Sequence, residues 1–285
     1  MSKPALLEGL SAIAADYDAT LCDVWGVIHN GVDAFPGACA ALERFRAERG
    51  PVVLISNAPR PSRALYSQLQ SVGVPESCWS GFVTSGDATR ALLAARAPGP
   101  AWVLGPPRDL PLYEGLPLEF ADRLEDAGFI VCTGPFHEEV ETPEDYRGRL
   151  ETAQALGLDM ICANPDRMVQ KGERLVYCAG ALAELYETLG GRSVMAGKPH
   201  RPIYDQALAE LEQIAGRPVD PRRVLCIGDG VNTDVRGAEL QGLDCLFLWG
   251  GVHAADLRQE SDAPAAELLA KHETRAKYAM AELAW

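Results

Sequence analysis

Apolar segments that end abruptly in polar residues constrain the fold of this chain more than any other feature. The segments at 19–29, 51–57 and 222–230 read ATLCDVWGVIH, PVVLISN and RRVLCIGDG. Short apolar runs bounded by Gly, Asn or Asp are typical of strands buried on both faces of a sheet. Each of these three runs therefore predicts a buried strand with chemically active side chains where the strand ends.

Helical patterns lie between these strands and predict a parallel sheet. The segments 36–50, 62–74 and 234–242 have helical spacing, and 243–250 reads as another strand. Strand and helix in alternation favour parallel strands with helices on both faces of the sheet. Gly50 is expected to end the first helix as a C-cap.

The middle of the chain has a different character and predicts an inserted unit. It is rich in Gly and Pro and contains its own strand candidates at 101–105 and 129–134, followed at 146–166 by a helix, a strand and a turn. We expect an α/β fold in which a Rossmann-like core, built from about 1–84 and 191–285, carries an α/β insert at about 85–190.

Charge and composition exclude some classes of partner. The formal net charge is −14, which disfavours nucleic acid and anionic membranes as partners. The N-terminal segment carries acidic residues and does not resemble a signal peptide, and no apolar run is long enough to cross a membrane. The eight cysteines contain no C-x-x-C pair, so buried thiols in the reducing cytoplasm are expected.

Four polar stretches follow predicted strands, and together they suit phosphoryl transfer. They are DVWG at 23–26, SN at 56–57, GKP at 197–199 and GDGVNTD at 228–234. The carboxyl ends of parallel strands share one edge of a sheet, where ligands bind. A carboxylate nucleophile, acidic ligands for Mg²⁺, a lysine and hydroxyl or amide donors are the groups that phosphoryl transfer needs. Taken singly, each stretch is equally well explained as turn chemistry or as ordinary surface.

In this order the four stretches resemble the four motifs of the haloacid dehalogenase (HAD) superfamily of hydrolases. The insert between the second and third motifs, and CANPD at 162–166, are similar to the class IIA branch, the NagD-like sugar phosphatases with a C2-type cap. The resemblance implies Asp23 as nucleophile and Mg²⁺ ligand, and Lys198 as the group that holds the phosphate and Asp23. It further implies Ser56 and the Asn57 amide as phosphate donors, and a metal site completed by the Trp25 backbone oxygen, Asp229 and, in the outer shell, Asp234.

Trp25 departs from the pattern of this family. Most of its phosphatases have a second Asp two residues after the nucleophile, which protonates the leaving group and then activates water. An indole N–H cannot replace that acid, although His29, in the same segment, is a candidate substitute or a polar residue of an exposed turn. Arg60, Asn164 and Asp166 are further candidates for substrate contacts, and turn chemistry explains the last two as well.

The sequence therefore predicts Mg²⁺-dependent hydrolysis of a small phosphate monoester through an aspartyl phosphate, slowed by Trp25. Hydrolysis of a carbon–halogen bond, as in 2-haloacid dehalogenases, stays open because that branch also lacks the second acid. A non-catalytic protein that binds a phosphorylated metabolite is a third reading. The expected partner is a small phosphorylated metabolite, with a homodimer as an open alternative.

Overall fold

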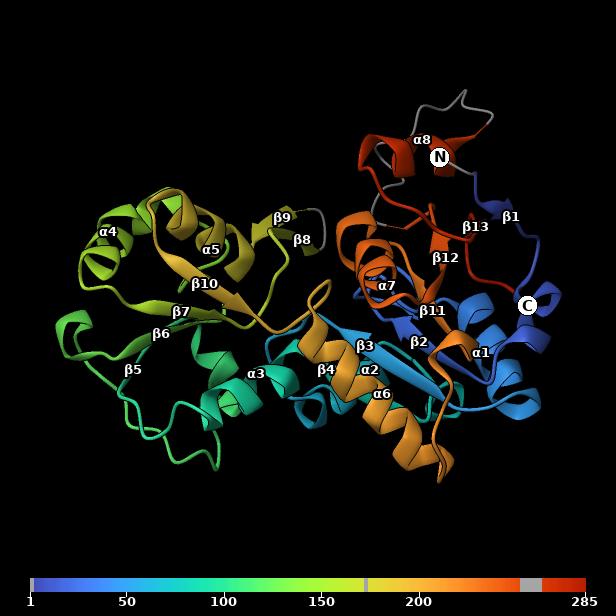
Figure 1. Cartoon of the computed structure of the whole chain (residues 1–285), viewed down its shortest axis with the longest axis horizontal. Helices are drawn as coiled ribbons and strands as arrows, with labels where there is room; N and C mark the ends of the chain where they lie inside the picture. Colours follow the sequence, from blue (N-terminus) through green and yellow to red (C-terminus); the bar gives the residue numbers. More distant parts are fainter. Residues whose placement is uncertain (1–2, 172–173, 252–262) are drawn as a thin grey trace. The chain divides into compact units, whose positions relative to one another are not determined.

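A computed structural model describes residues 3–171, 174–251 and 263–285, which form two compact units (Figure 1). The first unit comprises Met1–Ser56, Tyr66–Val83 and Tyr204–Trp285, and the second comprises Asn57–Leu65 and Thr84–Ile203. The second unit thus includes two segments, 57–65 and 191–203, that the sequence prediction counted with the core. The predicted domain boundaries themselves stay a prediction.

A seven-stranded sheet forms the first unit, in the order β1-β13-β12-β11-β2-β3-β4. Its strands are β1 (Ala5–Leu6), β2 (Ala19–Asp23), β3 (Val52–Ser56), β4 (Gly81–Thr84), β11 (Val224–Gly228), β12 (Asp244–Leu248) and β13 (Tyr278–Met280). Every strand pair in it whose register is described is parallel. Strands from the two ends of the chain, β2 and β11, lie side by side at its centre (Figure 1).

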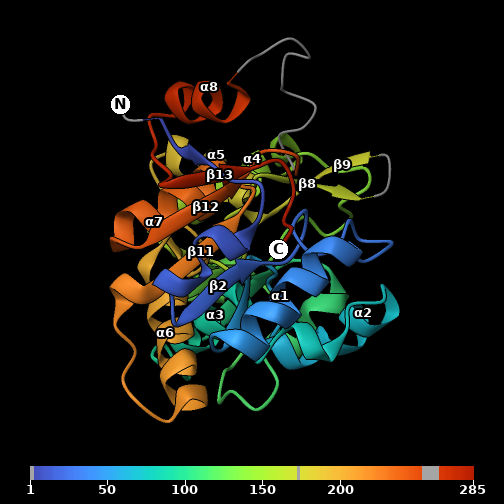
Figure 2. The same cartoon turned by 90° about the vertical axis from the view of Figure 1, so that its right-hand side faces the viewer.

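Helices cover both faces of this sheet. They are α1 (Pro36–Glu48), α2 (Tyr66–Ser71), α6 (Arg201–Ala215), α7 (Arg236–Gln241) and α8 (Pro264–Lys271). Figure 2 shows α1 and α2 on one side of the strands and α6 and α7 on the other. This arrangement explains why every residue of β2 and of β11 is buried, as their continuous apolar sequences predict.

The second unit contains a sheet of its own, with the parallel order β10-β7-β6-β5. Its elements are α3 (Ser85–Ala94), β5 (Ala101–Leu104), β6 (Phe129–Cys132), α4 (Arg147–Ala155), β7 (Asp159–Cys162), α5 (Ala179–Thr188), β10 (Arg192–Met195) and the antiparallel hairpin β8–β9 (Met168–Lys171 and Arg174–Tyr177). Apolar side chains of α4 and α5 cover one face, and Leu93 of α3 packs against the other. The predicted fold class, a Rossmann-like parallel core with a further α/β unit, is confirmed.

Two local predictions were wrong for identifiable reasons. The segment 62–74 is not one helix: the Ser62 N–H binds the Asp87 carboxylate, residues 62–64 form a separate 3₁₀ turn, and α2 begins only at Tyr66. Gly50 is not a left-handed C-cap, since Arg49 caps α1. A side chain at Gly50 would place its Cβ 2.1 Å from the Asp18 carbonyl oxygen, so close packing requires this glycine.

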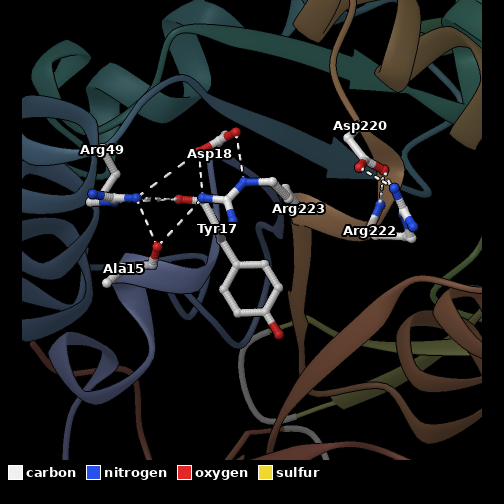
Figure 3. A network of polar contacts seen from close by, with 7 residues as sticks. All are labelled: Ala15, Tyr17, Asp18, Arg49, Asp220, Arg222 and Arg223. Carbon is white, nitrogen blue, oxygen red and sulfur yellow. Dashed lines mark hydrogen bonds and ion pairs between the residues drawn. The ribbon is translucent and has the colours of Figure 1, made fainter.

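An ion-pair network ties together the starts of the two central strands (Figure 3). Arg223, just before β11, donates to both carboxylate oxygens of Asp18, just before β2, at 2.8 and 2.9 Å. Arg49 donates to the Ala15 carbonyl at 2.9 Å and lies 4.0 Å from Asp18. These contacts lower the pKa of Asp18 and fix the amino ends of the strands whose carboxyl ends carry Asp23 and Asp229.

The eight cysteines are all buried and free, as the sequence predicts. Within residues 3–171, 174–251 and 263–285, none of the helices is both long and apolar enough to cross a membrane.

Candidate active site

Asp23 and Asp229 lie at the carboxyl ends of adjacent strands in the first unit. Cys22 of β2 is level with Ile227 of β11, so Asp23 closes its strand beside the point where β11 gives way to Asp229. Their carboxylates meet that of Asp234, and one oxygen from each of the three side chains lies within 4.8 Å of the others. The side chains are at most 8% exposed.

A single π-helical turn, Val231–Val235, directs Asp234 toward this cluster. One oxygen of Asp234 accepts the Gly230 N–H at 3.0 Å, which holds the carboxylate against the end of β11. A Cβ at Gly228 would lie 2.2 Å from the Asp234 Cγ, so only glycine fits at that position. The motif GDGVNTD therefore has a local structural reason for its first glycine, Gly228, and for its last acid, Asp234.

The electrostatics of this cluster call for a cation. Burying several carboxylates together costs free energy through desolvation and mutual repulsion unless positive charge offsets it. Carboxylate oxygens are the ligands that Mg²⁺ prefers, and a magnesium ion bound by two or three protein oxygens keeps water as its remaining ligands. The chemistry of these three side chains thus fits a hard divalent cation.

Two glycines make room for Asp229: the sequence analysis named Gly26 only as part of DVWG, and it missed Gly251. A Cβ at Gly26 or at Gly251 would lie 2.1 Å from Asp229 Oδ2. Gly26 also has a φ of +81°, which an L-residue rarely adopts. Their only signal in the sequence is their place, directly after Trp25 and at the end of the apolar segment 243–250.

The segment that follows Asp23 forms a tightly bonded turn. The Gly26 N–H donates to the His29 carbonyl at 2.8 Å, and the Asn30 side chain accepts from Val32 and Asp33 at 2.9 and 2.8 Å. Trp25 is half-buried, and its indole Nε1 lies beside Gly31. A Cβ added at Gly31 would lie 3.2 Å from this nitrogen. The turn thus presents a large indole, rather than a carboxylate, two residues after Asp23.

His29 does not occupy the exposed turn that the sequence suggested as one alternative. Its side chain is 3% exposed, and Nδ1 accepts the Gly31 N–H at 2.9 Å. Burial lowers the pKa of His29 to about 4. The ring is therefore neutral at pH 7, which argues against His29 as a replacement for the missing acid.

In the second unit, the side chain of Asn57 holds Lys198 from both sides of its backbone. Asn57 Oδ1 accepts the Lys198 N–H at 2.7 Å, while Nδ2 donates to the Lys198 carbonyl at 3.1 Å and to Asp166 at 2.8 Å. Lys198 is 2% exposed. A Cβ at Gly197 would lie 2.6 Å from Asn57 Oδ1, so the glycine before Lys198 permits this approach.

The remaining candidates lie near the carboxyl edge of the second sheet. Asn164 accepts the Asp166 N–H at 3.0 Å, which is the turn chemistry expected of CANPD. Arg60 lies 3.9 Å from the buried carboxylate of Asp109, which the sequence analysis missed, and burial raises the pKa of Asp109. Asp109 has no motif around it that would have singled it out.

The structure thus groups the predicted residues into two sets. The first unit contains Asp23, Trp25, His29, Ser56, Asp229 and Asp234, and the second contains Asn57, Arg60, Asn164, Asp166 and Lys198. Ser56 and Asn57 are consecutive residues at the end of β3. The three acids predicted to serve a metal come together, and Asn57, Asp166 and Lys198 form a second cluster. Their roles stay predictions.

Comparisons with known proteins agree with one another. A family described as haloacid dehalogenase-like hydrolase matches residues 20–129, and a second, described as HAD-hydrolase-like, matches residues 195–272. A haloacid dehalogenase-like hydrolase from Brucella suis 1330 is 47% identical in sequence. That similarity covers 97% of this chain and 99% of the other, with a TM-score of 0.88.

Two curated relatives have named activities. Glycerol-3-phosphate phosphatase from Gallus gallus is 28% identical, over 90% of this chain and 88% of its own. Ribonucleotide monophosphatase NagD from Escherichia coli K12 is 26% identical, over 83% of this chain and 89% of its own.

Proposed function

The chain belongs to the haloacid dehalogenase-like hydrolases, in their class IIA (NagD-like) branch, and we propose that it is a phosphatase that hydrolyses small phosphate monoesters with the help of Mg²⁺. The curated relatives support a phosphorylated metabolite as substrate, since their names specify glycerol 3-phosphate and ribonucleotide monophosphates.

The buried cluster of Asp23, Asp229 and Asp234 is the observation that carries this proposal. Phosphoryl transfer develops negative charge on several oxygens, and a divalent cation held by carboxylates is a common way to stabilise it. We propose that Mg²⁺ binds to Asp23, the Trp25 carbonyl oxygen and Asp229, with Asp234 in the outer shell. The ion would offset the negative charge of the phosphate.

The residues of the chain would divide the reaction between them. The Asp23 carboxylate attacks phosphorus, so that an aspartyl phosphate forms and the leaving group departs. The Ser56 hydroxyl and the Asn57 backbone amide donate to phosphate oxygens, and Lys198 supplies positive charge. The Asn57 side chain is already bonded to Lys198 and Asp166, so we assign it the placement of Lys198 instead of a contact with phosphate. Water then attacks the aspartyl phosphate and regenerates Asp23.

Carbon–halogen hydrolysis is the weaker alternative. That reaction displaces halide without a metal, and it would gain nothing from the buried second and third carboxylates of this cluster. A protein that binds phosphate without turnover would need the same cation site, so only an activity measurement separates it from the proposed phosphatase.

The decisive experiment is a screen for released phosphate and chloride. Glycerol 3-phosphate, ribonucleotide monophosphates, p-nitrophenyl phosphate and chloroacetate are each tested with Mg²⁺ and with excess EDTA. We expect phosphate release that requires Mg²⁺, is abolished in Asp23→Asn and shows a raised KM in Lys198→Ala. Chloride release without metal would establish the dehalogenase. Phosphate and Mg²⁺ binding with no turnover of any compound would establish the non-catalytic protein.

A further inference from the structure

The turn after Asp23 has a consequence for the kind of substrate that the site can use. When Asp23 displaces an alcohol from phosphorus, the departing oxygen needs a proton, because an alkoxide is about as basic as hydroxide. A positioned acid accelerates such a step by roughly 10²–10⁴-fold. The residues near Asp23 therefore decide which leaving groups depart readily.

Trp25 offers no proton to a leaving group. The indole N–H donates hydrogen bonds but does not ionise in the physiological range. Asp229 and Asp234 are the acids that we assign to the metal ion. Among residues 24–35 the one remaining carboxylate is Asp33, whose side chain is exposed at the tip of the turn and whose carbonyl accepts from the Asn30 N–H at 3.2 Å.

Hydrogen bonds hold this turn in place. The Phe35 N–H donates to the Ile28 carbonyl and the Ala34 N–H to the Val72 carbonyl, both at 2.8 Å. His29 is buried, and one of its two ring nitrogens already accepts from the Gly31 N–H. These bonds fix the conformation of the turn that carries Trp25, His29 and Asp33.

Resting on the proposed function, we infer that the site cleaves acyl phosphates and phosphoanhydrides, whose leaving groups depart as stable anions, faster than it cleaves alkyl phosphate monoesters. Carboxylic acids ionise near a pH of roughly 4, so an acyl leaving group departs as a carboxylate and takes no proton. In the first step the Asp23 oxygen forms a bond to phosphorus, the bond from phosphorus to the acyl oxygen breaks, and that oxygen keeps the electron pair. In the second step water adds to phosphorus, Asp23 leaves as a carboxylate, and both protons of the water remain on inorganic phosphate as H₂PO₄⁻. Neither step draws a proton from the protein.

Leaving-group dependence tests this inference. We compare acetyl phosphate, a series of substituted phenyl phosphates and glycerol 3-phosphate under saturating Mg²⁺, and measure kcat/KM, which includes leaving-group departure but not the later attack of water. Spontaneous hydrolysis of acetyl phosphate is subtracted with the Asp23→Asn variant. We expect kcat/KM for acetyl phosphate to exceed that for glycerol 3-phosphate by about 100-fold or more, and the phenyl series to slow steadily as the pKa of the phenol rises.

The variant Trp25→Asp installs a carboxylate at the position in question. It should raise kcat/KM for glycerol 3-phosphate by about ten- to a hundredfold, and so narrow the difference between the two substrates. If that variant does not fold, the phenyl series on the wild-type protein tests the inference alone.

Equal kcat/KM for acetyl phosphate and glycerol 3-phosphate, with a flat phenyl series, would overturn the inference and leave the proposed phosphatase intact. Absence of turnover for every compound, with Mg²⁺ present, would instead overturn the proposed function.

Discussion

A methyl group added at Gly26 should weaken the metal site without replacing any of its proposed ligands. The Cβ of Gly26→Ala would lie 2.1 Å from Asp229 Oδ2 and 3.0 Å from Cγ, whereas ordinary contacts begin near 3.4 Å. The carboxylate must therefore move by about 1 Å, and a displacement of that size at a reaction centre costs about 100-fold, or about 2.7 kcal/mol. We expect Mg²⁺ affinity, measured by titration calorimetry, and kcat/KM at limiting Mg²⁺ both to fall by about that factor.

Gly73→Ala is the matched control for this prediction. Gly73 has a φ of +83°, close to the +81° of Gly26, but nothing lies within 4 Å of its Cβ position. Both variants bear the strain of a left-handed alanine, about 1–2 kcal/mol of stability, and only Gly26→Ala displaces Asp229. Gly251→Ala, with the same 2.1 Å approach and no left-handed backbone, should repeat the loss of affinity. If Gly26→Ala binds Mg²⁺ as tightly as Gly73→Ala does, Asp229 is not a metal ligand as proposed.

Two other substitutions test the supports of the site. Asn57→Leu removes the hydrogen bonds to Lys198 and Asp166 and leaves buried polar groups unpaired. It should lower the free energy of unfolding, measured by urea titration, by about 2 kcal/mol, and it should raise KM. If both quantities are unchanged, Asn57 does not position Lys198. Asp18→Asn removes a carboxylate whose pKa is lowered in the folded protein. Its stabilisation is present above the unfolded pKa and is lost as pH falls through the folded pKa. We expect Asp18→Asn to lower the free energy of unfolding by about 1 kcal/mol at pH 7 and to have no effect at low pH. The control Asp220→Asn, which breaks a more exposed ion pair, should change the free energy of unfolding little. If the loss of stability in Asp18→Asn persists in acid, the ion-pair explanation is wrong.

The sequence was most informative where strand ends carry side chains of distinctive chemistry. The apolar runs before Asp23 and Asp229 predicted buried neighbouring strands, because parallel strands covered by helices have few other compositions. Asn57 and Lys198 are 141 residues apart, and their hydrogen bonds depend on how the second unit folds, so spacing could not predict them. The burial of His29 was equally hidden, since the Gly31 N–H that binds its ring belongs to a turn whose shape two left-handed glycines decide.

Short strands escaped prediction for a related reason. The strands β4 and β13 have four and three residues and owe their existence to the neighbours with which they pair. Their intrinsic preferences are too weak to identify them, and tertiary context decides. By contrast, β11 ends at Gly228, directly before Asp229, within two residues of the predicted segment's end, whereas β2 ends at Asp23, six residues before the end of the predicted segment 19–29.

The pairing of β2 with β11 also dictates the order in which the protein can mature on the ribosome. Residues 19–23 leave the exit tunnel about two hundred residues before their central partner, 224–228, is synthesised. During that interval one side of β2 lacks its neighbour, while the second sheet, whose strands all lie between 101 and 195, is already complete in sequence. The second unit is therefore available to fold first, and the acid cluster is assembled only when nearly the whole chain has emerged. Such long-range parallel pairing is slow to form and leaves an edge open to wrong partners, so nascent chains halted before residue 224 should depend on chaperones far more than the finished protein does.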